Sequence, residues 1–353
     1  MTTINLASGD SMKISEPLYN FVRDEVVSAS SLSANQVFEI LGDLIVQFGP
    51  KNRELLEKRD WVQSQIDSYY INKRKEGWTP SLQSAEDDAR DFEQFLMGIG
   101  YLGPARPIDF QVNTPSLDTE MEQNGPELVT PVTNASMVVG GANARWGSLY
   151  DAYFLSDINP SLDRETQRPE RLRMVVNDTN KFLDEHITKW SKDTSFNAIQ
   201  SYEIQKDENG KHRLTGRTYD GEVLTLEHPE KFIGFHLDES GTLSDFFLID
   251  NGLRIQVQLY SGGYIDKDNG QFKDLLVESA ITNIIDFEDA VTIVDAEDMV
   301  LALRNYLGVM TGDLVAFGSR GNLKTINSDK TITDINNDQV TLKATSLMSV
   351  RNV

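Results

Sequence analysis

Three carboxylates follow one apolar stretch of the chain. The run Ile-Ile at 284–285 leads directly into Asp286, Glu288 and Asp289. In a strand, Asp286 and Glu288 would point to the same face, because side chains alternate along it. Such a pair would suit a hard cation such as Mg²⁺, which prefers oxygen ligands, or would orient a neighbouring arginine. A solvated strand end beside a helix amino terminus is the alternative without a function.

Arg351 is the second candidate for chemistry. It follows the apolar segment 347–350, which is predicted to be a strand. At the mouth of an α/β barrel, a guanidinium polarises a carbonyl and holds a carboxylate in a bidentate pair. An exposed arginine without a role is the simpler alternative.

Other catalytic arrangements are missing from the sequence. None of the four histidines, at 186, 212, 228 and 236, has a second histidine at metal-ligand spacing. There is no Gly-x-Ser-x-Gly elbow and no Walker loop. Gly140-Gly141 is expected to precede a helix, but the rest of a dinucleotide fingerprint is absent. The chain has no cysteine, which excludes disulfides and thiolate chemistry.

Charge and composition restrict the partners. The formal net charge of −22 would repel nucleic acid, and any anionic substrate would need a local arginine, lysine, helix amino terminus or metal. Hydrophobic residues make up 39% and charged residues 25%, as in ordinary globular proteins. No apolar run is long enough to cross a bilayer, and the start of the chain lacks the pattern of an export signal. A cytoplasmic protein without a membrane partner is expected.

Periodicity predicts the elements that position these residues. Residues 1–100 are expected to be helical, with Ser33 capping a helix that Gly49-Pro50 ends, and with further helices at 52–75 and 84–97. Turn signals at 208–210, 220–221 and 251–252 predict an antiparallel sheet over 201–260. The remaining predicted helices are a segment through Tyr150 and Phe154, 168–190, 272–281 and 295–310. The remaining predicted strands are 127–132, 282–285, 330–333, 340–343 and 347–350.

Two long motifs carry a family resemblance. The first is Asn-Ala-Arg-Trp-Gly-Ser-Leu-Tyr-Asp-Ala at 143–152. The second is Ile-Asp-Phe-Glu-Asp-Ala-Val at 285–291, which continues through Val-Asp-Ala-Glu-Asp at 294–298 to Arg-Asn-Tyr-Leu-Gly at 304–308. The closing Arg-Asn-Val at 351–353 resembles a catalytic-arginine strand. In order and separation these blocks resemble the amino-terminal half of malate synthase G along all 353 residues.

The resemblance implies an α/β fold class. We expect an incomplete (β/α)8 TIM barrel with an N-terminal helical clasp and an inserted α/β domain containing antiparallel strands. The implied domains are a clasp at 1–103, a linker at 104–126, a first barrel strand region at 127–147, the insertion at 148–270, a barrel strand and helix at 271–309, a second part of the insertion at 310–345, and a truncated barrel strand at 346–353.

The implied activity is that of an acyltransferase of the glyoxylate bypass. Malate synthases condense acetyl-CoA with glyoxylate and water, giving (S)-malate and CoA. Magnesium and an arginine hold and polarise glyoxylate, and an aspartate removes a proton from the acetyl methyl group. The family's two principal magnesium carboxylates and its general-base aspartate lie beyond residue 353, so we expect this chain alone to be inactive. The complete protein is expected to be a monomer.

The resemblance also assigns residues to roles. Arg351 matches the catalytic arginine, and Asp286 and Glu288 match acids that line the site, with Glu288 as an outer-shell contact to Mg²⁺. Acetyl-CoA contacts fall on Val129, Ser136, Met137, Ala290 and Lys324. Ser-Met at 136–137 replaces the usual Arg-Tyr, and Ala290 replaces a common serine. These departures remove a positive charge and a hydroxyl from the CoA pocket.

Two interpretations remain open besides a partial malate synthase. The first is a non-catalytic fragment that needs a complementary half of the barrel. A related barrel lyase that acts on a CoA thioester, such as a citrate lyase β-type enzyme, is the second. That family lacks the clasp and the long insertion, which makes it the weakest of the three.

Overall fold

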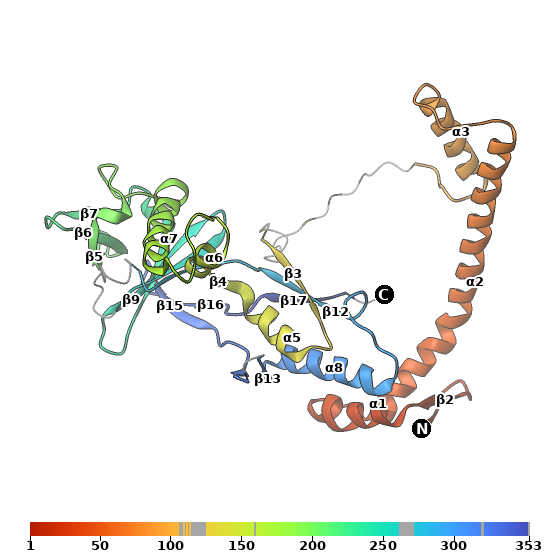
Figure 1. The fold of residues 1–353 in the computed structure, drawn as a ribbon. Helices are drawn as coiled ribbons and strands as arrows, with labels where there is room; N and C mark the ends of the chain where they lie inside the picture. The colour runs from red at the N-terminus through yellow and green to blue at the C-terminus, as the bar shows by residue number, and fades with distance from the viewer. Residues whose placement is uncertain are drawn as a thin grey trace. The chain divides into compact units, whose positions relative to one another are not determined.

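The computed structural model describes residues 1–105, 109, 111, 113, 125–158, 160–260, 272–318 and 321–351 (Figure 1). The expected linker at 104–126 lies largely outside these residues, as do Asn352 and Val353 of the closing motif. The chain divides into two compact units, Met1–Pro115 and Ser116–Val353. Within the described ranges, no helix combines the length and apolar character that crossing a lipid bilayer requires.

The first unit begins with strands rather than with the expected helix. The strands β1 (Thr2–Asn5) and β2 (Ser11–Ile14) form an antiparallel hairpin, with Gly9 at a φ of 88° in its turn. The buried side chains of Ile4 and Ile14 hold it in place. The helices of this unit are α1 (Glu16–Phe21), a π-helical turn (Val22–Val26), a short 3-10 turn (Val27–Ala29), α2 (Ala34–Lys75) and α3 (Ala85–Gly98).

Ser33 caps α2, as predicted. Its hydroxyl accepts a hydrogen bond from the backbone N–H of Gln36, whose side chain accepts one from the backbone N–H of Ser33. The prediction that Gly49-Pro50 ends this helix is wrong, because α2 continues through Pro50 to Lys75. A proline has a helical φ and removes only its own N–H donor, so a long helix can tolerate it at a local cost.

The second unit is a mixed α/β structure. A parallel sheet contains β3 (Glu127–Pro131), β12 (Thr282–Asp286) and β17 (Leu347–Arg351), with β12 in the middle. The helices α5 (Ala135–Ala142) and α8 (Ala296–Thr311) accompany it (Figure 1). Buried side chains from the strands and both helices, including Val138, Ile285 and Ala302, form their common core.

Gly140 and Gly141 lie inside α5, although they were expected to precede a helix. Gly141 is buried against β3 and β12, where an added Cβ would meet Asn283 Nδ2 at 2.5 Å and Thr130 Cγ2 at 2.7 Å. An added Cβ on Gly140 would meet nothing within 4 Å. The close approach of helix and sheet at Gly141 therefore requires glycine.

A larger antiparallel region is built from the segment that runs from β4 to β11 and from the later strands β15 and β16. Its seven-stranded sheet has the order β16-β15-β8-β9-β10-β11-β4, and β5, β6 and β7 form a separate sheet. The strands are β4 (Trp146–Ser148), β5 (Ile199–Lys206), β6 (His212–Thr218), β7 (Val223–Thr225), β8 (Phe232–Leu237), β9 (Leu243–Asp250), β10 (Leu253–Gln258), β11 (Asp274–Glu278), β15 (Lys330–Asp334) and β16 (Gln339–Leu342). The unit also contains the helices α6 (Leu149–Leu155) and α7 (Arg168–Phe182), a π-helical turn (Leu183–Ile187), three 3-10 turns (Asn143–Arg145, Phe196–Ala198 and Pro229–Lys231), and a small hairpin of β13 (Ala316–Phe317) and β14 (Leu323–Lys324).

The predicted turns at Gly210, Gly221 and Gly252 are confirmed, each with a positive φ. The predicted helix at 272–281 is wrong, because residues 274–278 form β11, which pairs with β10 and β4. The periodicity of a short apolar run does not separate a helix from a buried strand. Two neighbouring strands supply the hydrogen-bond partners that decide between them.

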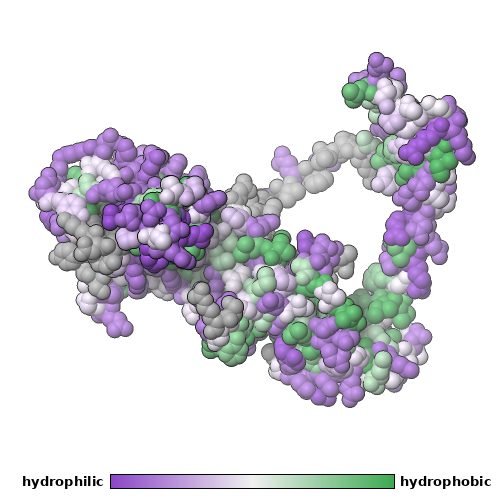
Figure 2. All heavy atoms as spheres, in the orientation of Figure 1, coloured by the Kyte–Doolittle hydropathy of each residue, from purple (hydrophilic) through white to green (hydrophobic). Residues whose placement is uncertain are grey.

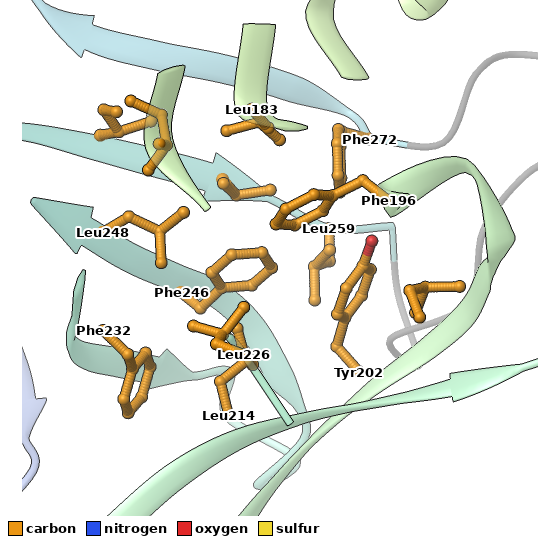
Figure 3. Close-up of a cluster of buried hydrophobic side chains, with 14 of the residues drawn as sticks. Leu183, Phe196, Tyr202, Leu214, Leu226, Phe232, Phe246, Leu248, Leu259 and Phe272 are labelled. Atoms are coloured by element: carbon orange, nitrogen blue, oxygen red, sulfur yellow. The ribbon is translucent and has the colours of Figure 1, made fainter. Parts of the chain in front are cut away.

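The core of the antiparallel region is rich in aromatic side chains. The ring centroid of Tyr202 lies 5.1 Å from that of Phe246 and 5.9 Å from that of Phe272, and Phe196 packs beside Phe272 (Figure 3). Figure 2 shows hydrophilic side chains over most of the visible face of this region. The region therefore has its own hydrophobic core, distinct from the one beneath the parallel sheet.

Candidate active site

The candidate site lies at the carboxyl ends of the three parallel strands. In the register of this sheet, Asp286 of β12 is level with Arg351 of β17 on one side and with Pro131 of β3 on the other. Parallel strands end at the same edge of a sheet, and this edge is where α/β proteins build their sites. The sheet therefore brings together an aspartate and an arginine that are 65 residues apart.

Asp286 is fully buried and receives four hydrogen bonds. Its Oδ1 accepts from the backbone N–H of Glu288 at 2.9 Å and from Arg351 Nε at 3.3 Å. Its Oδ2 accepts from the backbone N–H of Ala290 at 2.9 Å and from Arg351 Nη2 at 2.8 Å. The bonds from Arg351, aided by those from the two N–H groups, lower the pKa of Asp286 to about 2 against the opposing effect of burial. Asp286 is therefore a fixed anion that sets the position of Arg351.

Arg351 keeps part of its guanidinium available. The side chain is 42% exposed, and its Nη1 has no hydrogen-bond partner among the residues that the structure describes. A guanidinium has five N–H donors in a planar fork, and Asp286 uses two of them. The remaining donors have the geometry to bind a carboxylate or a carbonyl oxygen. The nearby carboxylates raise the pKa of Arg351, so it stays charged.

Glu288 and Asp289 surround the arginine at a longer range. A carboxylate oxygen of Glu288 lies 3.9 Å from Arg351 Nε, and one of Asp289 lies 3.8 Å from Nη2. The expectation that Asp286 and Glu288 share one face of a strand is wrong, because β12 ends at Asp286. The chain turns after that residue, so that the backbone N–H groups of Glu288 and Ala290 point at the Asp286 carboxylate. Asp289 was part of the acidic motif but had no predicted role.

These carboxylates do not make a magnesium site by themselves. Both oxygens of Asp286 already accept two hydrogen bonds each, which leaves no lone pair directed at a cation. Within the described part of the chain, no group of three or more His, Asp or Glu side chains is arranged to hold a metal ion. Of the two roles that the sequence left open for Asp286, the geometry favours orienting the arginine over binding a cation.

The five positions assigned to acetyl-CoA come from four different segments. Val129 lies on β3 and is 47% exposed, and Met137, in the first turn of α5, is also 47% exposed. Ser136 precedes it and is half-buried. Lys324 lies on β14, in the small hairpin that contacts α5. Ala290 is the one of the five that the structure ties to Asp286, through its backbone N–H.

Residues without a predicted role support the strand ends. Thr130 of β3 donates a hydrogen bond of 2.7 Å to Asn283 of β12, and both side chains are buried. Asn305 of α8 donates to the carbonyl of Val132, just after β3. Their polar side chains in otherwise apolar segments were the one sequence feature that pointed to such a role, because buried polar groups need hydrogen-bond partners. Their partners are more than 150 residues away and could not be named from the sequence.

The fold is that of an α/β protein in which a buried carboxylate holds an arginine at the carboxyl ends of parallel strands. Profiles of known protein families give no match to this chain. Curated proteins do match over 97% of it: malate synthase G of Corynebacterium efficiens is 34% identical, that of Corynebacterium glutamicum 33%, and that of Halalkalibacterium halodurans 32%. The chain covers 44%, 45% and 46% of these proteins, respectively, so it spans less than half of their length. The chain belongs to the malate synthase G family, and its coverage fits the expected amino-terminal half.

Proposed function

We propose that this chain supplies the glyoxylate-binding arginine of a malate synthase. The pair of Arg351 and Asp286 carries the proposal, because it offers free guanidinium donors at the edge of a parallel sheet. The reaction would join the acetyl methyl carbon of acetyl-CoA to the aldehyde carbon of glyoxylate. Water would then cleave the thioester, releasing (S)-malate and CoA as part of the glyoxylate bypass.

In this proposal Arg351 binds the negatively charged groups of the substrate. Its free donors would bind the carboxylate and the carbonyl oxygen of glyoxylate, and they would stabilise the negative charge that grows on that oxygen during attack. Asp286 would be a positioning residue. With a pKa of about 2 and four hydrogen bonds, it is unsuited to accept a proton from an acetyl group. The general base would come from another part of the polypeptide.

The acetyl-CoA positions are proposed from the family resemblance and not from a bound ligand. Val129, Ser136, Met137, Ala290 and Lys324 would contact the cofactor, with Lys324 as the positive group among them. Since Ser136 and Met137 replace Arg-Tyr, the pocket would hold the phosphates of CoA with one fewer cation. Magnesium would supply Lewis-acid polarisation of glyoxylate, but the described residues do not fit it as principal ligands.

The rest of the architecture is part of the same proposal. The three parallel strands would belong to a (β/α)8 barrel, residues 1–103 to a clasp, and the segments 148–270 and 310–345 to an insertion. The proposed enzyme would be a cytoplasmic monomer.

Thiol release from acetyl-CoA tests the proposal. The polypeptide encoded by the complete reading frame and the 353-residue chain would be assayed with glyoxylate and Mg²⁺. We expect thiol release that depends on glyoxylate only from a longer polypeptide. Turnover by the 353-residue chain would contradict the proposal that the general base and the main magnesium ligands come from another part of the polypeptide. A reading frame that ends after Val353 would favour a non-catalytic chain that needs a complementary half.

A further inference from the structure

The seven-stranded antiparallel sheet has a second face that the aromatic core does not use. On β9 and β10, Phe246 and Val257 point into the core, while their neighbours Asp245 and Gln256 point to the opposite side. There a cavity of about 340 Å³ is lined by β8, β9, β10 and β15. None of its lining residues belongs to the candidate active site.

A hydrogen-bonded network of polar side chains lines the cavity. Lys330 Nζ donates to Gln256 Oε1 at 2.7 Å, and Gln256 Nε2 donates to Asp245 Oδ1 at 2.6 Å. Ser244 Oγ donates to Asp245 Oδ2 at 2.7 Å and lies 2.9 Å from His236 Nδ1. Gln256 is only 2% exposed, so its amide is fixed with the carbonyl oxygen towards the lysine. The network holds Lys330 in a defined place.

Lys330 has more hydrogen-bonding capacity than its surroundings use. An ammonium carries three donors, and among the described residues Lys330 donates a hydrogen bond only to Gln256. Burial lowers the pKa of Lys330, and the negative charge of Asp245 only partly opposes this effect. A half-buried cation with unused donors gains from an anionic ligand, because low-dielectric surroundings strengthen the attraction.

The charge of the cavity is opposite to that of the chain. Its lining contains two ammonium groups, from Lys273 and Lys330, and one carboxylate, from Asp245, which leaves a formal charge of +1 with His236 neutral. The whole chain has a formal charge of −22. An acidic protein repels anions, so an anionic ligand binds it only where positive charge is concentrated locally, as in this cavity.

We propose that this cavity is a binding site for a small carboxylate, with Lys330 as its main cation and Lys273 as a second one. Phe247 and Ile332 are nearly fully buried and give the cavity an apolar side. A short carbon chain would rest there while its carboxylate meets the ammonium group. Inorganic phosphate would leave the apolar side uncovered, so the lining favours a carboxylate.

Succinate is the probe for this site, and succinamide is its neutral counterpart of similar size. Calorimetric titration of the 353-residue chain at constant ionic strength should show saturable binding of succinate and none of succinamide. Lys330→Met should weaken succinate binding at least about tenfold, the size of effect expected when one charged hydrogen bond is lost. Lys206→Met makes the same change at an exposed lysine of β5 and should leave the affinity within about twofold.

A second measurement uses the unmodified chain. Succinate should slow the reductive methylation of Lys330, followed by mass spectrometry, and should leave Lys206 unaffected. The proposal is overturned if succinate does not bind, if Lys330→Met and Lys206→Met bind it equally well, or if Lys330 is not protected. Phosphate binding as tight as succinate binding would overturn the choice of a carboxylate. None of these outcomes bears on the proposed acyl transfer, because none of the residues proposed for it lines this cavity.

Discussion

Arg351 at the end of β17 donates two hydrogen bonds to separate oxygens of Asp286, its register partner at the end of the neighbouring strand β12. Two backbone N–H groups of the following turn complete the set of donors around the carboxylate. The pair is thus held from both sides.

Asp286→Asn should destabilise the chain in a way that depends on pH. The folded state lowers the pKa of Asp286 from 3.8 to about 2, so its stabilisation is fully present above about pH 4 and disappears as pH falls through about 2. The expected loss is on the order of 2 kcal/mol at pH 7. Urea unfolding at pH 7 and at pH 2.5 measures it, and the difference between variant and wild type should shrink at the lower pH.

Asp289→Asn is the matched control. The side chain of Asp289 is 77% exposed and lies 3.8 Å from Arg351 Nη2, so its loss should change the free energy of unfolding by less than about 0.5 kcal/mol. Equal effects of the two substitutions at pH 7 would show that the buried hydrogen bonds of Asp286 do not stabilise the fold.

Arg351→Lys should remove most of the proposed activity. A lysine keeps the charge but cannot hold Asp286 in two places and bind a carboxylate with further donors. We expect kcat for thiol release by the complete polypeptide to fall at least about 100-fold. Arg217→Lys, on the exposed part of β6, should leave kcat unchanged. Near-normal turnover of Arg351→Lys would remove this residue from the mechanism.

Two adjacent glycines of α5 should respond in opposite ways to alanine. Gly141→Ala places a methyl group 2.5 Å from Asn283 Nδ2 and next to Thr130, so it should destabilise the chain by about 1–3 kcal/mol. Gly140→Ala meets no atom within 4 Å and should stabilise it by about 0.5–1 kcal/mol, because alanine favours the helix. Thermal unfolding of both variants gives the comparison, and shifts of the same sign would contradict the predicted packing.

Glu278→Gln should be costly although it changes few atoms. Glu278 Oε1 accepts from Arg145 Nε at 2.9 Å and pairs with Nη2 at 2.8 Å, and Oε2 accepts from the backbone N–H of Arg254 at 2.8 Å. The variant leaves the guanidinium of Arg145 buried without its counter-charge, at a cost of about 3 kcal/mol. Urea unfolding measures this loss.

Glu203→Gln provides the comparison for that pair. Its partner Arg217 lies 3.6 Å away, and the Glu203 side chain is 49% exposed. We expect a change below about 0.5 kcal/mol, as is usual for surface ion pairs. If both variants lost the same stability, burial would not be the source of the effect at Glu278.

Much of the local structure was predictable from residues that lie close together in the sequence. Ser33 and Gln36 cap α2, Asp295 caps α8 by accepting from the N–H of Asp298, and Gly312 ends that helix at a φ of 82°. Glycine turns likewise marked the hairpins of the antiparallel region. The family motifs indicated the family without any coordinates.

The sequence by itself determined the caps, the turns and the acidic motif after β12, because each of these depends on residues within a few positions of one another. It also indicated the family, because the order and separation of the motifs can be read without coordinates. Only the tertiary structure decided that 274–278 is a strand, that α2 continues through Pro50, and that Asp286 uses its oxygens on Arg351 rather than offering them to a cation. It also decided that Lys330 lies in a cavity beside Gln256, 74 positions away. Such contacts depend on strand pairing and burial between distant segments, which no local pattern of residues specifies.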